Sequence, residues 1–481
     1  MAFIDGTIVN VAAPKFQSAF HATVVDVQWV IESYGLFLSS LILVGGALGD
    51  RLGRRFVFLI GVAIFAVASA ACGLAPNIAF LIIARAFQGI GAALLVPGSL
   101  AIISACFDEA SRGRAIGTWS AFTAITTALG PVLGGWLIEH ASWRWAFFLN
   151  LPLAALVLAI SLRHVPESRN PDATRLDWLG AILATTTLGA LVTGFLESSR
   201  LGYRDPIVIS SLVAALVLLI LFLRVEAHAD SPMVSFALFR SNAFLGANLL
   251  TLFLYAAIGI FFFLFPITLM QVHRYSATAA GAASLPMIVL IFSLSRWSGN
   301  LTSRYGGKIP LFVGPLLVAG GFVLFALVAK GGNYWKTFFP ASVVLGLGMA
   351  VTVAPLTTVV MGAIDKNHSG AASGINNAVS RVAGVLAIAV LGIVLVKAFA
   401  THLERSLATL PIAPEAAYEI RGKEIELAGM ELPKSLDPSA TASVRQAVSE
   451  SFLSAFRLVL FCCAALAVVS AVISWRFIPG K

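Results

Sequence analysis

The sequence predicts an all-α polytopic membrane protein, and composition and patterning support this fold class. Of the 481 residues, 59% are hydrophobic and only 11% are charged, whereas soluble domains carry about 25% charged residues. The mean hydropathy is +0.92. The apolar residues form long runs, about as long as a helix that crosses a bilayer. These runs lack the two-residue alternation of strands, so each is predicted to be helical.

Fourteen apolar runs are candidate membrane-spanning helices. They occupy approximately residues 1–20, 28–49, 56–75, 78–106, 114–138, 143–164, 178–197, 206–225, 243–271, 278–298, 310–329, 335–362, 370–399 and 453–478. Polar inserts divide them into an N-terminal six-helix bundle (1–165), two linking helices with flanking loops (166–242) and a C-terminal six-helix bundle (243–481). The last bundle includes a polar outer segment, 400–452, whose four prolines argue against one continuous helix.

Short internal repeats indicate that the two outer groups are related. The loop GALGDRLGRR (46–55) is echoed by GNLTSRYGGK (299–308), and GIGAALLVP (89–97) is echoed by GLGMAVTVAP (346–355). Parallel repeats of six helices are a known transporter architecture. The repeats therefore favour a transporter built from two similar bundles.

Basic residues predict the orientation of the chain in a cell (inner) membrane. With a cytoplasmic N-terminus, fifteen Lys and Arg residues lie inside and seven lie in short outside loops. Because basic residues gather in cytoplasmic loops, both termini are predicted to be cytoplasmic. The first run has only about 21 Å of helix before Lys15, which is short for a crossing. We therefore expect helix 1 to begin upstream of Met1.

Several other classes of protein lack sequence support. The basic residues form no stripe for nucleic acid, and the four cysteines contain no CxxC pair that would hold a metal. No GxxxxGK[ST], HExxH or GxSxG pattern occurs, so ATP-driven transport and an embedded hydrolase are not indicated. The chain is predicted not to be an enzyme and to need no cofactor or metal.

Five motifs occur in order along the first half: DGTIVNVAAP (5–14), GALGDRLGRR (46–55), RAFQGIGAALLVP (85–97), GPVLGG (130–135) and WRWAFFLNLP (143–152). Together they resemble the major facilitator superfamily, and more narrowly its fourteen-helix drug:proton antiporter branch. The resemblance implies a secondary transporter that exports small lipophilic or cationic compounds in exchange for protons by alternating access. The alternatives are an exporter or symporter of one specific metabolite, and a transport-inactive receptor or partner subunit.

Three ionisable residues within the apolar runs are candidates for proton coupling: Asp5, Arg85 and Glu32. Charges inside a bilayer cost at least about 2.5–3.5 kcal/mol, so each needs a reason. A carboxyl group shielded from water can exchange a proton near physiological pH. The resemblance implies such a role for Asp5, with Arg85 tuning it. The alternatives are a hydrated terminal Asp5, a snorkelling Arg85 and an interfacial Glu32.

Two further motifs carry implied roles. In the resembled family, the loop at 46–55 is a conformational latch, here Gly46, Asp50, Arg51, Gly53, Arg54 and Arg55; a positive-inside anchor is the alternative. GPVLGG marks antiporters in that family, here Gly130, Pro131, Gly134 and Gly135. Ordinary small-residue packing is the alternative for this motif.

Candidate substrate contacts are polar or aromatic residues within the runs: Gln88, Asn10, Tyr255, Phe262, Asn376 and Arg381. Helix packing is an equal alternative for Asn376 and Arg381, and lipid contact is an alternative for the aromatic residues. The expected partners are a small-molecule substrate, protons and the lipid bilayer. A periplasmic adaptor that contacts 400–452 is a further expectation.

Overall fold

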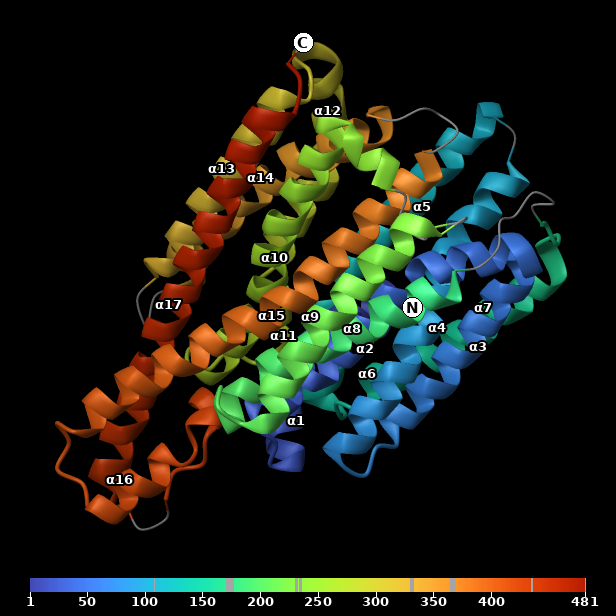
Figure 1. Ribbon diagram of the computed structural model, residues 1–481. Coiled ribbons are helices and arrows are strands. Elements are labelled where there is room, and N and C mark those ends of the chain that lie inside the picture. Colours follow the sequence, from blue (N-terminus) through green and yellow to red (C-terminus); the bar gives the residue numbers. More distant parts are fainter. Residues whose placement is uncertain are drawn as a thin grey trace.

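The computed structural model describes residues 1–107, 109–169, 177–229, 232, 236–328, 333–363, 369–433 and 436–480. In these ranges the chain is helical, without strands, and its helices form one elongated bundle (Figure 1). The prediction of an all-α membrane fold is therefore confirmed. Apolar side chains from the helices fill the interior, and many others face outward, as lipid contact requires.

The helices follow the predicted runs, with two of these runs divided by short breaks. In chain order they are α1 (Ala2–Phe20), α2 (Val24–Leu52), α3 (Arg54–Gly73), α4 (Ile78–Cys106), α5 (Glu109–His140), α6 (Trp145–Phe148), α7 (Asn150–His164), α8 (Trp178–Leu201), α9 (Pro206–His228), η1 (Phe236–Arg240), α10 (Asn242–Gln271), α11 (Ala277–Ala282), α12 (Leu285–Tyr305), α13 (Lys308–Ala326), α14 (Tyr334–Gly362), α15 (Ser369–Leu407), α16 (Pro414–Arg421), η3 (Glu424–Gly429) and α17 (Pro438–Phe477).

Twelve helical stretches within the described ranges are long and apolar enough to cross a membrane. They are α2, α3, α4, α6 with α7, α8, α9, α10, α11 with α12, α13, α14, α15 and α17. The chain is thus a multi-pass membrane protein. The remaining two predicted runs, 1–20 and 114–138, are occupied by α1 and α5, which stand outside this group of twelve.

The polar segment 400–452 is helical at both ends and broken in the middle. Helix α15 continues to Leu407, and α17 already begins at Pro438. The Asp437 side chain caps α17 by accepting from the Ala440 amide at 2.6 Å, and Pro438 suits the first helical position. The predicted interruption by prolines is therefore observed, but it is shorter than the polar composition suggested.

The packing of α1–α7 is repeated in α10–α17. In the first group, α1 packs on α5, α2 on α4, and α3 on α4 and α7; in the second, α10 packs on α15, α12 on α14, and α13 on α14 and α17. Figure 1 shows α3, α4 and α7 on one side of the molecule and α13, α14 and α17 on the other. The groups meet where α2 contacts α15, α5 contacts α11 and α1 contacts α10.

Hydrogen bonds join the two groups toward the end of the bundle that carries α16 and η3. Gln271 Nε2 donates to Gln17 Oε1 at 2.8 Å, and Gln17 Nε2 donates to the Glu426 carbonyl at 3.3 Å. Thr278 Oγ1 donates to Glu139 Oε2 at 2.6 Å. These contacts hold the first and second groups together at this end.

Candidate functional site

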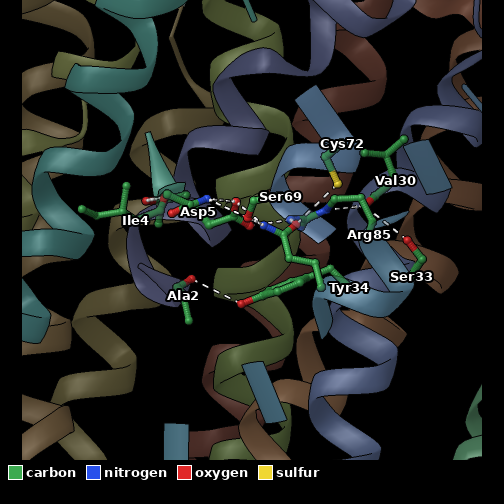
Figure 2. A network of polar contacts seen from close by, with 12 residues as sticks. Ala2, Ile4, Asp5, Val30, Ser33, Tyr34, Ser69, Cys72 and Arg85 are labelled. Atoms are coloured by element: carbon green, nitrogen blue, oxygen red, sulfur yellow. Dashed lines mark hydrogen bonds and ion pairs between the residues drawn. The ribbon is translucent and has the colours of Figure 1, made fainter. Parts of the chain in front are cut away.

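A buried ion pair lies among the first helices. Arg85 Nη1 on α4 is 2.5 Å from Asp5 Oδ2 on α1, and the two side chains are 1% and 0% exposed. Figure 2 shows both residues within a continuous polar network enclosed by helices. The sequence placed these charges in apolar runs, and the structure brings them into direct contact. Each charge therefore compensates the other inside the bundle.

The second carboxyl oxygen of Asp5, Oδ1, accepts two hydrogen bonds. Gln88 Nε2 donates to Asp5 Oδ1 at 2.9 Å, and Asn150 Nδ2 on α7 donates to the same atom at 3.0 Å. Both amides also donate to Ser69 Oγ on α3, at 2.7 and 3.3 Å. Side chains from α4 and α7 thus bind the Asp5 carboxyl group directly, and Ser69 of α3 supports both amides. Any change in the charge of this carboxyl group alters its contacts with α4 and α7.

Arg85 is held in a fixed orientation by several partners. Its Nε donates to the Val30 carbonyl at 3.1 Å, and its Nη1 donates to Gln88 Oε1 at 2.7 Å. The guanidinium carbon also lies 4.2 Å from the centre of the Tyr34 ring, a cation–π contact. The planar guanidinium therefore connects α1, α2 and α4, a geometry that a single ammonium group does not reproduce.

Substitution of Arg85 tests this geometry. We expect both Arg85→Ala and Arg85→Lys to lose most of the proton-driven transport that the sequence resemblance implies, because lysine keeps the charge but not the paired Nε and Nη1 donors. The measurement is transport by each purified variant in proteoliposomes of equal protein content. Full recovery in Arg85→Lys would show that charge alone is needed and that the guanidinium geometry is not.

A central cavity of about 280 Å³ lies beside the buried network. Its walls come from α1, α2, α4, α10 and α15, and they include four of the predicted substrate contacts: Asn10, Tyr255, Phe262 and Arg381. A neighbouring cavity of about 310 Å³ shares Asn10 and Phe262 and extends between α1, α5, α10, α11 and α12. Both cavities thus lie between the first and second groups of helices.

The other predicted substrate contacts lie elsewhere. Gln88 belongs to the buried network, where it binds Asp5, Arg85 and Ser69. Asn376 donates to Asn248 Oδ1 at 3.2 Å and to Thr251 Oγ1 at 2.7 Å, so its amide joins α15 to α10. For Asn376, the structure therefore shows the packing contacts that were the alternative interpretation.

Glu32 lies apart from the Asp5 network. It contributes to the wall of the central cavity from α2 and is 1% exposed. Within the described part of the chain, neither of its carboxyl oxygens has a hydrogen-bond partner. Glu32 is therefore a buried residue of the cavity wall in the observed arrangement, and its assignment as a second titrating acid or as an interfacial residue stays a prediction.

Comparisons with known proteins agree with this architecture. Residues 1–388 match the family described as the Major Facilitator Superfamily. The chain belongs to this superfamily. It is 34% identical over 495 residues to the multidrug resistance protein Stp of Mycobacterium tuberculosis, covering 100% of this chain and 90% of Stp. It is 32% identical over 480 residues to the tetracenomycin C resistance and export protein of Streptomyces glaucescens, covering 98% and 88%.

A solved structure supports the same fold. A bacterial homologue of the human lysosomal transporter Spinster, in an inward-facing and unoccupied conformation, aligns with a TM-score of 0.61 at 19% identity. The alignment covers 99% of this chain and 95% of that one. As a superfamily member, the chain is a transporter and not an enzyme, as the sequence predicted.

The superfamily signature loop forms an ion pair at the end of α2. Arg54 Nη2 lies 2.8 Å from Asp50 Oδ1, one helical turn away in the chain. Gly53 between the two helices has φ = 123°, a conformation that favours glycine. Gly46 lies on α2 against Pro97 of α4, and Arg51 is exposed. The structure therefore pairs Asp50 with Arg54.

Arg55 of this loop contacts Glu167, a residue that sequence reasoning did not select. Both oxygens of Glu167 accept hydrogen bonds at 3.0 Å, from the backbone amides of Arg55 and Phe56. Arg55 Nη1 donates to the Val165 carbonyl at 2.9 Å. Glu167 thereby caps the N-terminus of α3, where a carboxylate is favourable. The only indication of this role in the sequence is that Glu167 is an acidic residue just after a predicted membrane span.

The GPVLGG motif places α5 against helices of both groups. A side chain at Gly130 or Gly134 would meet Thr7 or Ile8 of α1. A side chain at Gly135 would meet the Ala277 backbone of α11, and the Pro131 carbonyl lies where a side chain at Gly281 would be. The glycines therefore allow close helix contact in two directions, one of them across the junction between the groups.

Sequence reasoning also missed Ser69, Tyr34 and Asn150 as members of the network. All three are buried polar residues within apolar runs, so the need for hydrogen-bond partners was a usable signal. Their chain positions give no indication that they meet around Asp5. Cys72 joins them through a 3.8 Å contact of its sulfur with Gln88 Oε1, and all four cysteines are free.

Proposed function

We propose that this protein is a proton-coupled antiporter that exports small lipophilic or cationic compounds by alternating access, a multidrug efflux function. The observation that supports this proposal most directly is the buried Asp5–Arg85 pair beside a cavity between the two groups of helices. The names of its relatives, which refer to resistance and export, support the same direction of transport.

Protonation of Asp5 provides a physical route to coupling. A neutral carboxyl group no longer balances the Arg85 charge, and its contacts with Gln88 and Asn150 lose their ionic character. Because these partners lie on α4 and α7, proton binding weakens the attachment of α1 to the rest of its group. Helix α1 also packs on α5 and α10, so this change reaches the junction that alternating access must rearrange.

We further propose a fourteen-span topology in a cell (inner) membrane, with both termini cytoplasmic. Helices α1 and α5 would supply two spans beyond the twelve that meet the criteria of length and hydropathy. The repeated packing supports two six-helix bundles, 1–165 and 243–481, with α8 and α9 linking them in 166–242. The distribution of basic residues supports the orientation.

The signature loop acts in this proposal as a latch. The Asp50–Arg54 pair and the Glu167 cap connect the end of α2, the start of α3 and the segment after α7. The outer segment 400–452 offers an exposed aromatic contact at Tyr418, which is 81% exposed. This residue is where we would place a periplasmic adaptor.

Reconstitution tests the proposed function. Purified protein in liposomes, given an imposed proton gradient, is expected to move lipophilic cationic dyes against their concentration gradient. An uncoupler should abolish this movement, and liposomes without protein provide the control. Dye transport that persists without a proton gradient would contradict proton-driven multidrug export. So would the absence of transport for every member of a broad set of lipophilic compounds.

A further inference from the structure

Arg381 is a cation in the wall of the central cavity. It lies on α15 and faces the same cavity as Tyr255 and Phe262 of α10. Within the described residues it makes no hydrogen bond or ion pair to another side chain. A guanidinium group keeps its proton in proteins, so this position stays charged. The second group of helices therefore contributes an uncompensated positive charge to the cavity.

The nearest ionisable groups do not cancel this charge. Arg85 also contributes to the cavity wall, but Asp5 compensates its charge. Tyr34 also contributes to the cavity wall, and its hydroxyl donates its hydrogen to the Ala2 carbonyl at 3.3 Å. A neutral phenol adds no negative charge. Neither the Asp5–Arg85 ion pair nor the Tyr34 hydroxyl therefore balances the charge of Arg381.

Glu32 is the only acidic residue among the described cavity-lining side chains, and its carboxyl group is buried without a hydrogen-bond donor. It makes no ion pair with Arg381, and no described group donates a hydrogen bond to either carboxyl oxygen. Burial without donors disfavours a carboxylate. In this arrangement the cavity therefore carries one net positive charge.

The other side chains of the cavity wall are suited to contact with the apolar part of a ligand. Carbon-rich side chains line the cavity around the two arginines: Ile31, Leu38, Ile258, Phe262, Val385 and Ile388. Ligand sites combine such walls with a few polar groups that fix orientation. From this combination we infer that the cavity takes lipophilic organic acids, whose carboxylate or phenolate binds Arg381. This inference rests on the proposed export of small lipophilic compounds. It names lipophilic anions, in place of cations, as the compounds that this cavity binds in the observed arrangement.

Equilibrium binding to the full-length protein in lipid nanodiscs tests the inference without a proton gradient. The probes are 9-anthracenecarboxylate and 9-anthracenecarboxamide, which share one ring system and differ in charge at pH 7.5. We expect the acid to bind at least about tenfold more tightly than the amide, because ionic hydrogen bonds are about twice as strong as neutral ones. Empty nanodiscs give the correction for partition into lipid.

Variants locate the effect at Arg381. Arg381→Gln should weaken acid binding about tenfold and leave amide binding within about twofold, which also shows that the variant is folded. Arg405→Gln, on an exposed residue of the same helix, should leave both affinities unchanged. If Arg381→Gln binds neither probe, Arg381→Lys decides the matter: a retained preference for the acid supports the inference, and its loss overturns it.

Glu32→Gln tests the charge assignment. Because glutamine mimics an uncharged glutamic acid, the variant should still prefer 9-anthracenecarboxylate over the amide. A tenfold gain in its affinity for 9-anthracenecarboxylate would show that Glu32 is ionised in the wild-type protein and already balances Arg381, which overturns the inference. Equal affinity of the wild-type protein for the two probes also overturns it, even if dyes are transported. Conversely, acid binding at Arg381 without any gradient-driven transport would contradict the export function and leave this binding site intact.

Discussion

Replacing Asp5 with Asn is expected to abolish proton-driven transport. The amide keeps the size of the side chain but cannot take up or release a proton. It also leaves the buried Arg85 without its counter-charge, and breaking a buried ion pair costs about 3–5 kcal/mol. We therefore expect no transport above the level of protein-free liposomes, together with a lower yield of folded protein.

A double variant separates these two effects. Asp5→Asn with Arg85→Gln removes both charges, so it should recover stability, measured by thermal unfolding in detergent, without recovering transport. Asp5→Glu retains a titratable group and should keep part of the activity. Undiminished gradient-driven exchange by Asp5→Asn would exclude Asp5 as a coupling residue, whatever the stability of the variant.

Replacing Gly135 with Leu should produce the second large loss of transport. A side chain at this position would overlap the Ala277 backbone of α11, so the observed contact between α5 and α11 cannot form. Overpacking costs about 1–3 kcal/mol, which shifts a conformational equilibrium about 5- to 150-fold. The transport rate in proteoliposomes should fall by at least about fivefold, while the amount of inserted protein stays similar.

Two further glycines make this test specific. Gly281→Leu on α11 should behave like Gly135→Leu, because its side chain would meet the Pro131 carbonyl from the other side of the same contact. Gly299→Leu is the matched control, since no atom of the described residues lies within 4 Å of a Cβ at that position. If all three variants transport alike, close contact between α5 and α11 is not required for the cycle.

The relation between the two halves of the chain could be predicted only in outline. The echo of GALGDRLGRR at 299–308 indicated a repeat, and the packing pattern of the two groups agrees with it. The sequence did not indicate that Glu167 would cap α3. Nor did it distinguish Asn376, which bonds to α10, from Arg381, which faces the cavity, because both lie within one short polar stretch.

The sequence by itself determined the all-helical membrane fold and singled out Asp5 and Arg85. Both conclusions follow from the bilayer, because apolar runs of sufficient length must form helices there and a charge inside them needs a partner. Only the tertiary structure decided which partners these are. Gln88 and Asn150 reach Asp5 from α4 and α7, and Ser69 of α3 accepts hydrogen bonds from both amides. Contacts between residues so distant in the chain depend on helix packing, which no local pattern encodes.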